Sequence, residues 1–322
     1  MVDLSIIVAT YNHERYIRHA LNSILDQRVS FTYEVLIGED NSTDHTKEVL
    51  KEMENYLPDN FHIFYREVNY GPLKNFKDLY NRSTGRYCIV LEGDDYWIYN
   101  DKLQKEFDFL ESNPAYIAVA HNTLVVNENE TTISVNYPEC HKNEYTFDDF
   151  KKSILPGQTT TKMVRNYHKF EGIIKGGDID VGNYPGDQRE AFLLCMNGKV
   201  KCIQEKWSAY RLVTSHGSSH MATLHYDREE ELYYWEQLSE YTLKYFPENR
   251  HAVQYLLERV IYCYFIGRCQ KYQYKRKYDI LRYYKLIPDK VGLYVYMCRI
   301  ILWPFRSIPR LVKKLSWKYK SK

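Results

Sequence analysis

Two adjacent aspartates, Asp94 and Asp95, follow the apolar segment 88–91 after Glu92 and Gly93. Neighbouring carboxylates repel each other unless a positive group lies between them, and Mg²⁺ or Mn²⁺ prefers oxygen ligands of this kind. Such ions commonly bind through one or two carboxylates together with substrate phosphates, and would neutralise the charge on a departing diphosphate. The pair therefore predicts metal-assisted chemistry on a phosphate-bearing substrate, although two aspartates alone could also form a turn.

The segments around these acids predict strands that alternate with helices. Apolar, β-branched runs such as residues 4–10 are typical of strands covered on both faces. The pattern predicts strands over residues 4–10, 33–38, 61–66 and 86–92, and helices that end near residues 27, 56 and 82. Asn12 and either Ser42 or Thr43 are the expected caps of the first two helices. This alternation predicts an α/β fold with a mainly parallel sheet flanked by helices.

Polar residues gather where three of these strands end. They are Thr10, Tyr11 and Asn12 after the first strand, Glu39, Asp40, Asn41 and Ser42 after the second, and Asp94 and Asp95 after the fourth. Ligands of parallel α/β sheets bind beyond the carboxyl ends of the strands. Each cluster alone could be explained by helix capping or a turn. Together they predict a ligand site, because a packed sheet needs no carboxylates at its edge.

The composition excludes several classes of protein. The chain has 322 residues, of which 44% are hydrophobic and 27% charged, which is typical of a globular protein and not of a disordered chain, a collagen or a coiled coil. The net charge of +2 gives no global basic field, so we expect no nucleic-acid partner. Seven irregularly spaced cysteines without a CxxC motif indicate neither a disulfide framework nor a zinc site. With no signal-peptide pattern at the N-terminus, these features predict a cytoplasmic protein.

The last third of the chain is helical in pattern, rich in tyrosine and basic. Residues 270–322 hold 15 Lys and Arg residues against two Asp residues. The most apolar stretch, 291–308, is interrupted by Arg299, Pro304 and Arg306, so it is a poor candidate for a membrane span. Basic residues mixed with aromatic ones in a helical pattern favour a helix lying on an anionic membrane surface. The alternative is a helix packed on the rest of the protein with a solvated basic face.

Five segments in order resemble family 2 glycosyltransferases of the GT-A fold. They are SIIVATYN (5–12), VLIGEDNSTD (35–44), LEGDDYW (91–97), DKLQKEFDFLESNP (101–114) and GDQREAFLLCMNGKV (186–200). The resemblance covers about residues 3–215. We therefore expect a catalytic domain over 1–220, with a nucleotide-binding half over 1–100 and an acceptor half over 101–220. A helical region over 221–322 would follow it.

The resemblance implies a role for each matching residue. Thr10, Tyr11 and Glu14 match the residues around the nucleotide at the first strand, and Asp40 matches the aspartate that binds a uracil-type base. An ionised carboxylate only accepts hydrogen bonds, which suits a base that presents an N–H. Lys74 falls where a basic residue often approaches the nucleotide, although a solvated helical lysine would look the same.

The metal-binding motif and the catalytic base are also implied by the resemblance. Asp94 and Asp95 match the metal motif, and Asp94 would also lie against the nucleotide. Asp187 matches the catalytic base of an inverting transfer, which removes a proton from the acceptor hydroxyl as the new bond forms. Its alternative role is a helix N-cap, and Asp178 and Asp180 are weaker candidates for the base. His216 is a further candidate ligand of the metal or diphosphate, although it stands three residues after the position where the family often has a histidine and this chain has Val213.

These residues predict a metal-dependent, inverting glycosyltransferase that uses Mn²⁺ or Mg²⁺ and a nucleotide-sugar donor, UDP-linked. The expected acceptor is a saccharide or a polyprenyl-diphosphate-linked saccharide in the synthesis of a bacterial surface polysaccharide. The protein would lie in the cytoplasm, peripheral at the inner face of the cell membrane. Two alternatives are a nucleotidyltransferase, against which the glycine-free segment VATYNHER argues, and a non-catalytic protein that binds nucleotide sugars or acts as a membrane scaffold.

Overall fold

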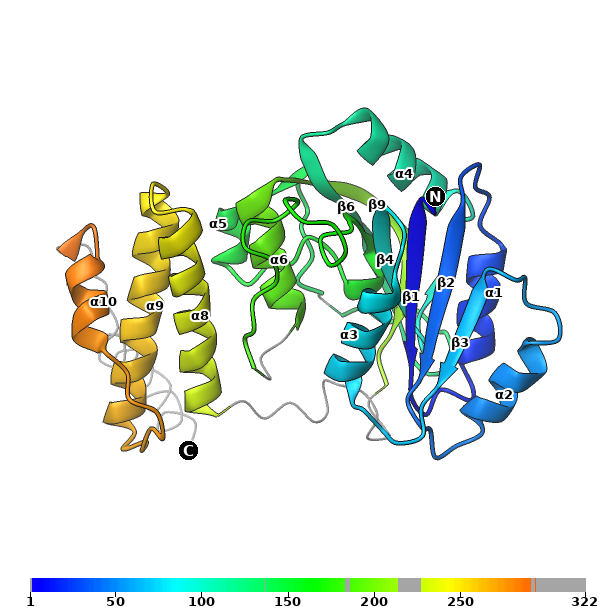
Figure 1. Ribbon diagram of the computed structural model, residues 1–322, viewed down its shortest axis with the longest axis horizontal. Coiled ribbons are helices and arrows are strands. Elements are labelled where there is room, and N and C mark those ends of the chain that lie inside the picture. Colours follow the sequence, from blue (N-terminus) through cyan, green and yellow to red (C-terminus); the bar gives the residue numbers. More distant parts are fainter. Residues whose placement is uncertain (1, 136, 183–185, 214–226, 291–292, 294–322) are drawn as a thin grey trace, which may run out of the picture. The chain divides into compact units, whose positions relative to one another are not determined.

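The computed structural model describes residues 2–135, 137–182, 186–213, 227–290 and 293. It divides into two compact units (Figure 1). The first unit comprises Met1–Asp178 and Pro185–His225, and the second comprises Ile179–Tyr184 and Tyr226–Lys322. The domain boundary expected at residue 220 lies outside the described residues, as do residues 294–322 of the basic tail.

A nine-stranded sheet forms the centre of the first unit within the described ranges, in the order β3-β2-β1-β4-β8-β6-β9-β5, with β7 paired to β9. The strands are β1 (Leu4–Thr10), β2 (Tyr33–Glu39), β3 (Phe61–Tyr65), β4 (Tyr87–Glu92), β5 (Tyr96–Trp97), β6 (Tyr116–Val126), β7 (Glu144–Tyr145), β8 (Lys162–Arg165) and β9 (Lys199–Arg211). The α/β fold predicted from the sequence is confirmed.

The direction of the strands determines where their ends meet. β1 pairs in parallel with β2 and β4, and β2 pairs in parallel with β3. Beyond β4 the sheet is mixed, because β8 runs antiparallel to both β4 and β6 while β6 and β9 are parallel. The carboxyl ends of β1, β2, β4, β6 and β9 therefore lie at one edge of the sheet. The antiparallel β8 starts at this edge, so the segment before it also reaches the site.

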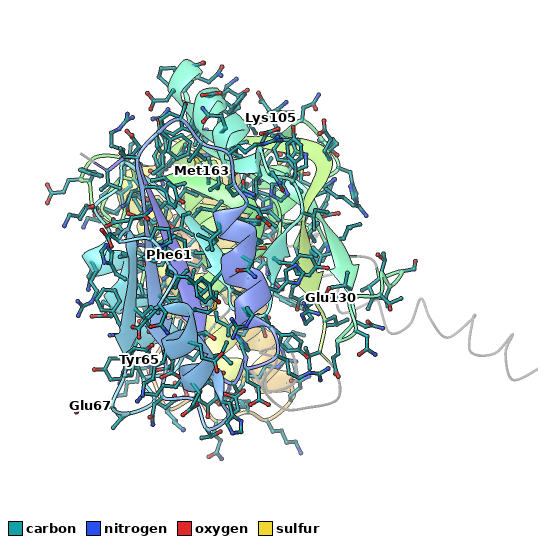
Figure 2. All side chains as sticks on the ribbon, turned by 90° about the vertical axis from the view of Figure 1, so that its right-hand side faces the viewer. Phe61, Tyr65, Glu67, Lys105, Glu130 and Met163 are labelled. Atoms are coloured by element: carbon teal, nitrogen blue, oxygen red, sulfur yellow. The ribbon has the colours of Figure 1, made fainter. Side chains whose placement is uncertain are left out.

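Helices cover both faces of the sheet. The helices of the first unit are α1 (Ile17–Leu25), α2 (Thr46–Met53), α3 (Pro72–Arg82), α4 (Lys102–Ser112), α5 (Phe147–Phe150), the 3₁₀ helix η1 (Thr159–Thr161) and α6 (Gly186–Asn197). Figure 1 shows α3 on the opposite side of β1 and β2 from α1 and α2. Figure 2 shows α1 in front of the strands, with Phe61 and Tyr65 of β3 to one side of it and Glu130 to the other.

One continuous core joins the sheet to α1, α2 and α4. It contains the fully buried side chains of Ile6, Val8, Leu21, Ile37 and Leu103. Because alternate residues of a strand face opposite sides, the apolar runs of β1 and β2 can bury side chains on both faces. This burial gives the sheet edge a rigid base, so the loops at its carboxyl edge start from fixed positions.

The second unit contains α8 (Arg228–Tyr245), α9 (Arg250–Cys269) and α10 (Ile280–Leu286). Helix α8 begins at a capping box, in which Asp227 accepts from the backbone of Glu230 and Glu230 reaches back to Asp227. Buried residues such as Leu232, Leu238 and Leu256 hold α8 and α9 together. The predicted helical C-terminal region is confirmed over these helices. No helix in the described part of the chain has the length and apolar character needed to cross a membrane.

The helix caps predicted at Asn12 and at Ser42 or Thr43 are wrong. Helix α1 begins at Ile17 and α2 begins at Thr46, several residues later than predicted. Asn12 adopts a left-handed backbone conformation with φ of 58°, which a short polar side chain tolerates. These polar side chains bind the neighbouring loop, as described below, and leave the helices to start further along the chain.

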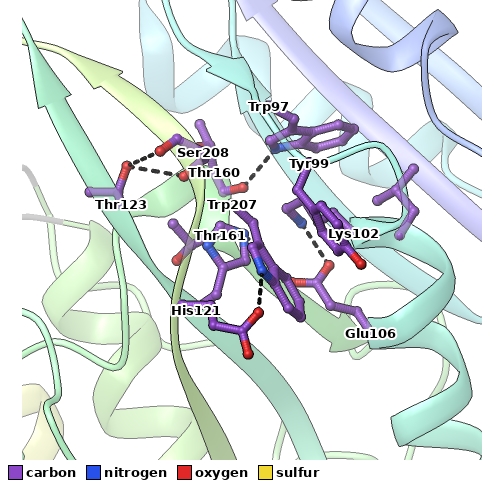
Figure 3. A network of polar contacts seen from close by, with 12 residues as sticks. Trp97, Tyr99, Lys102, Glu106, His121, Thr123, Thr160, Thr161, Trp207 and Ser208 are labelled. Carbon is purple, nitrogen blue, oxygen red and sulfur yellow. Dashed lines mark hydrogen bonds and ion pairs between the residues drawn. The ribbon is translucent and has the colours of Figure 1, made fainter.

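A buried ion pair lies below the carboxyl edge of β4, beside the short strand β5 (Figure 3). Lys102 Nζ lies 2.6 Å from Glu106 Oε2, and neither side chain is exposed. The Lys102 ammonium also lies 4.7 Å from the ring centre of Trp97 in β5. Burial raises the pKa of Glu106 to about 7, and burial lowers the pKa of Lys102. Glu106 therefore holds a proton in the folded chain at pH values where an exposed glutamate is ionised.

The free energy of unfolding should carry a pH-dependent contribution from Glu106. Its folded pKa of about 7 exceeds the ordinary value of 4.5, so stability falls as the pH rises from 4.5 to about 7. We expect the double variant Lys102→Met/Glu106→Gln to lack this component, on the order of 1–3 kcal/mol, in urea titrations across this range. An Arg18→Met/Glu52→Gln control, which removes an exposed ion pair of 2.7 Å, should keep the wild-type profile. An unchanged slope in the Lys102/Glu106 variant would contradict the assignment.

Candidate active site

The loops after β1 and β2 are joined by hydrogen bonds between backbone and side chains. The backbone N–H of Asn12 donates to Ser42 Oγ over 3.0 Å, and the N–H of Thr43 donates to Asn12 Oδ1 over 2.8 Å. The N–H of Glu14 donates to Asp44 Oδ2 over 3.0 Å. The polar residues of the first two clusters therefore build one loop structure at the end of the sheet.

Glu14 contributes to this structure through its carboxylate. Its Oε2 accepts from the backbone N–H of His45 over 2.8 Å and lies 2.9 Å from His45 Nδ1. These hydrogen bonds lower the pKa of Glu14. The carboxylate is thus engaged with the segment before α2, and contact of Glu14 with a nucleotide stays a prediction.

The end of β1 lies close to the end of β4. Thr10 is buried, and its Oγ1 lies 3.2 Å from His13 Nδ1, whereas Tyr11 is half-buried. A Cβ atom on Gly93 would lie 2.8 Å from Thr10 Oγ1 and 2.7 Å from His13 Nδ1. Glycine is therefore required at position 93, because any side chain would push the acidic turn away from the β1 loop.

Asp40 is buried at the end of β2, with 3% of its surface exposed. Its Oδ1 accepts from the backbone N–H of Tyr70 over 2.7 Å. Burial raises the pKa of this carboxyl, while the N–H groups of Tyr70 and Gly71 oppose the rise. The loop before α3 thus engages the Asp40 carboxylate, and contact of Asp40 with a base stays a prediction.

Helix α3 is fixed against β2 by a buried amide. Asn75 Nδ2 donates to the carbonyl of Gly38 over 2.9 Å, and its Oδ1 accepts from Arg66 Nη2 over 3.1 Å. A Cβ on Gly38 would lie 2.3 Å from Asn75 Oδ1, so this close approach needs glycine. Lys74 precedes Asn75 and is exposed in the first turn of α3, consistent with either of its predicted roles.

Three carboxyl groups converge at the end of β4. Asp95 is buried, whereas the Asp94 side chain is 22% exposed and its Oδ2 lies 3.8 Å from His13 Nε2. Burial and the neighbouring Asp94 raise the pKa of Glu92 to about 7, and burial raises the pKa of Asp95 well above its usual range. The turn therefore crowds three acids together, and Asp94 is the acid of the adjacent pair that solvent reaches more readily.

Arg211, the last residue of β9, holds this turn in place. Its backbone N–H donates to Asp95 Oδ1 over 2.8 Å, and its Nε donates to the Asp94 carbonyl over 2.8 Å. Its Nη2 lies 3.0 Å from Glu130 Oε1, and its guanidinium lies 4.3 Å from the ring centre of Tyr16. The buried guanidinium thus joins the acidic turn to α1 and to the loop after β6.

Asp187 lies in the first turn of α6, near the acidic turn. Its Oδ1 accepts from the backbone N–H of Gln188 over 2.8 Å. Its charge is among those that raise the pKa of Glu92, so the predicted base and the acidic turn share one region. An ion pair of 2.9 Å between Glu190 of α6 and Lys162 of β8 attaches this helix to the sheet.

Two tyrosines border the same region. The rings of Tyr137 and Tyr210 meet edge to face with their centres 5.6 Å apart. Burial raises the pKa of both hydroxyls, and the charges of Asp187, Glu92 and Asp95 add to this rise. The two half-buried rings therefore lie beside these carboxyl groups.

The residues present fit a divalent ion that also binds phosphate oxygens. Within the described ranges, no three His, Cys, Asp or Glu side chains form a ready metal cage. Mg²⁺ and Mn²⁺ commonly use only one or two carboxylates and complete their shell with substrate phosphates and water. Asp94, open to solvent and surrounded by other acids, has the chemistry for this, whereas both oxygens of Asp95 are engaged in hydrogen bonds. His216 lies outside the described residues.

Sequence reasoning did not identify three residues that shape this site. For Arg211, the available signal is the Tyr210-Arg211 pair in the sequence. His13 lies one residue beyond a predicted polar cluster. Gln158, which donates to Glu92 and Asp95, is isolated in sequence, and only the pairing of β8 with β4 reveals its position.

A sheet of this topology with acidic residues at the carboxyl ends of β2 and β4 defines a glycosyltransferase of the GT-A type. Residues 1–349 of S. aureus TarS, solved in complex with UDP-GlcNAc, have the same fold, with a TM-score of 0.61 at 18% identity. The match covers 89% of this chain and 82% of that one.

The chain belongs to glycosyl transferase family 2, whose model matches residues 5–173. This match confirms the family that the five motifs indicate, and it confirms the prediction that the protein is a glycosyltransferase. The nucleotidyltransferase alternative finds no support.

Two relatives extend the comparison. An uncharacterised protein of Mycobacterium tuberculosis is 30% identical over 220 residues, which are 68% of this chain and 61% of that protein. TuaG of Bacillus subtilis, named a putative teichuronic acid biosynthesis glycosyltransferase, is 28% identical over 224 residues, or 67% of this chain and 81% of TuaG. The chain thus matches about three fifths of the length of the mycobacterial relative.

Replacing Arg211 should destabilise the first unit strongly. In Arg211→Met, the Asp94 carbonyl loses its side-chain donor and Glu130 keeps only its contact with His19, so we expect a loss of about 2–4 kcal/mol in urea unfolding. Arg28→Met is the matched control, since it removes an exposed contact of 2.8 Å to Asp101 and should cost less than about 1 kcal/mol. Equal losses in the two variants would show that Arg211 is not the anchor of the acidic turn.

Proposed function

We propose that this protein transfers a sugar from a UDP-linked donor to a hydroxyl of a saccharide or lipid-linked saccharide, with inversion at the anomeric carbon. The observation that carries the proposal is the convergence of Asp40, the Glu92–Asp95 turn and Asp187 at one edge of the sheet. These groups have the chemistry to bind a base, neutralise a diphosphate and accept a proton.

The donor would bind across the ends of β1, β2 and β4. The Asp40 carboxylate can accept from the N–H of a uracil-type base, because an ionised carboxylate offers only acceptors. Asp94 would hold Mn²⁺ or Mg²⁺, which when bound neutralises the charge of the leaving nucleoside diphosphate. TarS, which shares the fold, was solved with UDP-GlcNAc, so the fold can hold a donor of this class.

Asp187 would act as the base. The acceptor oxygen forms a bond to the anomeric carbon while the bond between that carbon and the diphosphate oxygen breaks, and the acceptor proton passes to the carboxylate of Asp187. Oδ1 already accepts from the Gln188 N–H, so Oδ2 is the oxygen that would take the proton. A single displacement of this kind inverts the configuration.

The acceptor would lie against Tyr137 and Tyr210. Pyranose rings present apolar C–H faces that pack on aromatic rings, and these two rings border the carboxylate proposed as the base. A saccharide acceptor also agrees with the name of TuaG, which refers to teichuronic acid biosynthesis. We therefore extend the proposal to the synthesis of a surface polysaccharide or its lipid-linked precursor.

Substitutions of Asp187 and Asp94 should separate chemistry from donor binding. Asp187→Asn should lower sugar transfer or donor hydrolysis at least about 10³-fold while UDP binds within about twofold of wild type. Asp94→Asn should weaken UDP binding in Mn²⁺ but not in EDTA. Binding would be measured by calorimetry and UDP release by a coupled assay over a panel of nucleotide sugars. Wild-type turnover in Asp187→Asn would rule out its role as the base.

The C-terminal region would hold the enzyme on an anionic membrane, at the inner face of the cell membrane. Helix α10 exposes Leu281, Tyr284 and Leu286, with exposed fractions of 61%, 43% and 43%, beside Lys285. Apolar side chains next to basic ones suit the surface of an anionic bilayer. The enzyme and a lipid-linked acceptor would then share one membrane surface.

Vesicle sedimentation would test this attachment. The full chain should bind vesicles with 30–40% anionic lipid, roughly the density at which basic segments gain about 1 kcal/mol per charge, and should not bind neutral vesicles. Lys313→Gln/Lys314→Gln/Lys318→Gln should weaken this binding at least about tenfold. The control Lys51→Gln/Lys77→Gln/Lys152→Gln removes three exposed charges from the first unit and should bind as wild type. Equal binding by the two triple variants would exclude attachment through the tail.

A further inference from the structure

Gln158 bridges two acids of the β4 turn. Its side chain is buried, with 2% exposed, and its Nε2 lies 3.0 Å from Glu92 Oε2 and 3.0 Å from Asp95 Oδ2. Its Oε1 accepts from the backbone N–H of Thr160 over 2.7 Å and from the Thr160 hydroxyl over 2.6 Å. Because two donors face this oxygen, the amide is oriented with its NH₂ group toward the two acids.

The segment that carries Gln158 is built to keep it in one place. Thr161 Oγ1 donates to the Gln158 carbonyl over 2.7 Å. Trp97 Nε1 donates to the Thr160 carbonyl over 3.0 Å, as Figure 3 shows. A Cβ on Gly157 would lie 2.2 Å from Thr161 Oγ1 and 2.9 Å from the His121 carbonyl. Only glycine fits at 157, because a Cβ atom would collide with this hydroxyl and this carbonyl, so the backbone before Gln158 lies directly against both.

The bridge affects the two adjacent aspartates differently. Asp95 has both oxygens engaged, one with Gln158 Nε2 and the other with the backbone N–H of Arg211. Asp94 is held through its backbone carbonyl by Arg211, which leaves its carboxylate partly exposed beside His13. The turn is thus fixed through Asp95 and Glu92, and Asp94 is presented at its surface.

The chemical nature of the bridge matters as much as its position. An amide donates two hydrogen bonds and carries no charge, so it bridges the two acids without adding a positive charge beside them. A lysine or arginine in its place would satisfy the same oxygens and would also reduce the negative charge that attracts a cation. A neutral donor is therefore suited to a turn that must stay acidic.

We propose that Gln158 is a positioning residue for the metal and diphosphate site. Its NH₂ group fixes Glu92 and Asp95 so that the Asp94 carboxylate faces the bound cation and the diphosphate of the donor. This role rests on the metal-dependent function proposed above. It is distinct from catalysis, because Gln158 contacts the acids of the turn and reaches the donor only through them.

Binding of Mn²⁺ to the full chain tests this role without turnover. Two variants remove the donor: Gln158→Glu keeps an oxygen for Thr160 and has no NH₂ group, and Gln158→Met keeps the length and adds no charge. With saturating UDP, we expect each folded variant to bind Mn²⁺ at least about tenfold more weakly than wild type, by the loss of the free-ion signal in electron paramagnetic resonance. UDP binding in EDTA should stay within twofold.

Asn166→Leu is the matched structural control. Asn166 is a buried amide just beyond the other end of β8, and its Nδ2 donates to Ser83 Oγ over 3.0 Å and to the Gly85 carbonyl over 2.9 Å. This variant should lose stability and yet bind Mn²⁺ as wild type does. If Asn166→Leu binds Mn²⁺ as weakly as the Gln158 variants do, general destabilisation explains the weaker binding, and the proposal is overturned.

Two further outcomes separate this role from the proposed function. A wild-type protein that binds no Mn²⁺ in the presence of UDP would overturn the metal-dependent function and the role of Gln158 with it. Normal binding by wild type, with a dissociation constant within twofold in folded Gln158→Met, would overturn the role of Gln158 alone.

Discussion

The acids at the end of β4 repel one another, and the surrounding structure must hold them together. Glu92, Asp94 and Asp95 lie within four residues, and the charge of Asp187 reaches the same region. An unbound protein must hold these groups together by hydrogen bonds, because each buried charge costs free energy unless it is paired. Backbone N–H groups, one amide and one buried guanidinium do this, and the guanidinium donates to the Asp94 carbonyl rather than to a carboxylate of the turn.

The topology of the sheet supplies these donors from distant parts of the sequence. The parallel strands β1, β2 and β4 bring their carboxyl ends to one edge, as open α/β sheets do around ligands. Because β8 runs antiparallel to β4, the segment before β8 lies at this same edge and brings Gln158 to it. In a fully parallel sheet, the segment before that strand would lie at the opposite edge. Strand β9 lies parallel to β6 and ends at Arg211, whose backbone N–H binds Asp95 in the acidic turn.

Local sequence predicts those features that depend on neighbouring residues. The apolar runs of β1, β2 and β4 follow from their composition, and the acids at the strand ends follow from the parallel order. Asn12 and Ser42 show the limit, because a polar residue before a helix predicts a cap equally well whether or not another loop competes for it. Gln158 and Arg211 depend on pairings between strands far apart in the chain, which a single sequence does not specify.

The hydrogen bonds between the loops after β1 and β2 have a consequence for how mutations combine. Each loop offers a backbone N–H to a side chain of the other, as in Asn12 with Thr43 and Glu14 with Asp44. When a substitution removes one group of such a hydrogen-bonded pair, the other group has already lost that hydrogen bond, so replacing it as well costs little more. Substitutions in these two loops are therefore coupled, and the cost of a double variant is smaller than the sum of its parts. The two segments behave as one energetic unit although about 30 residues separate them in the chain.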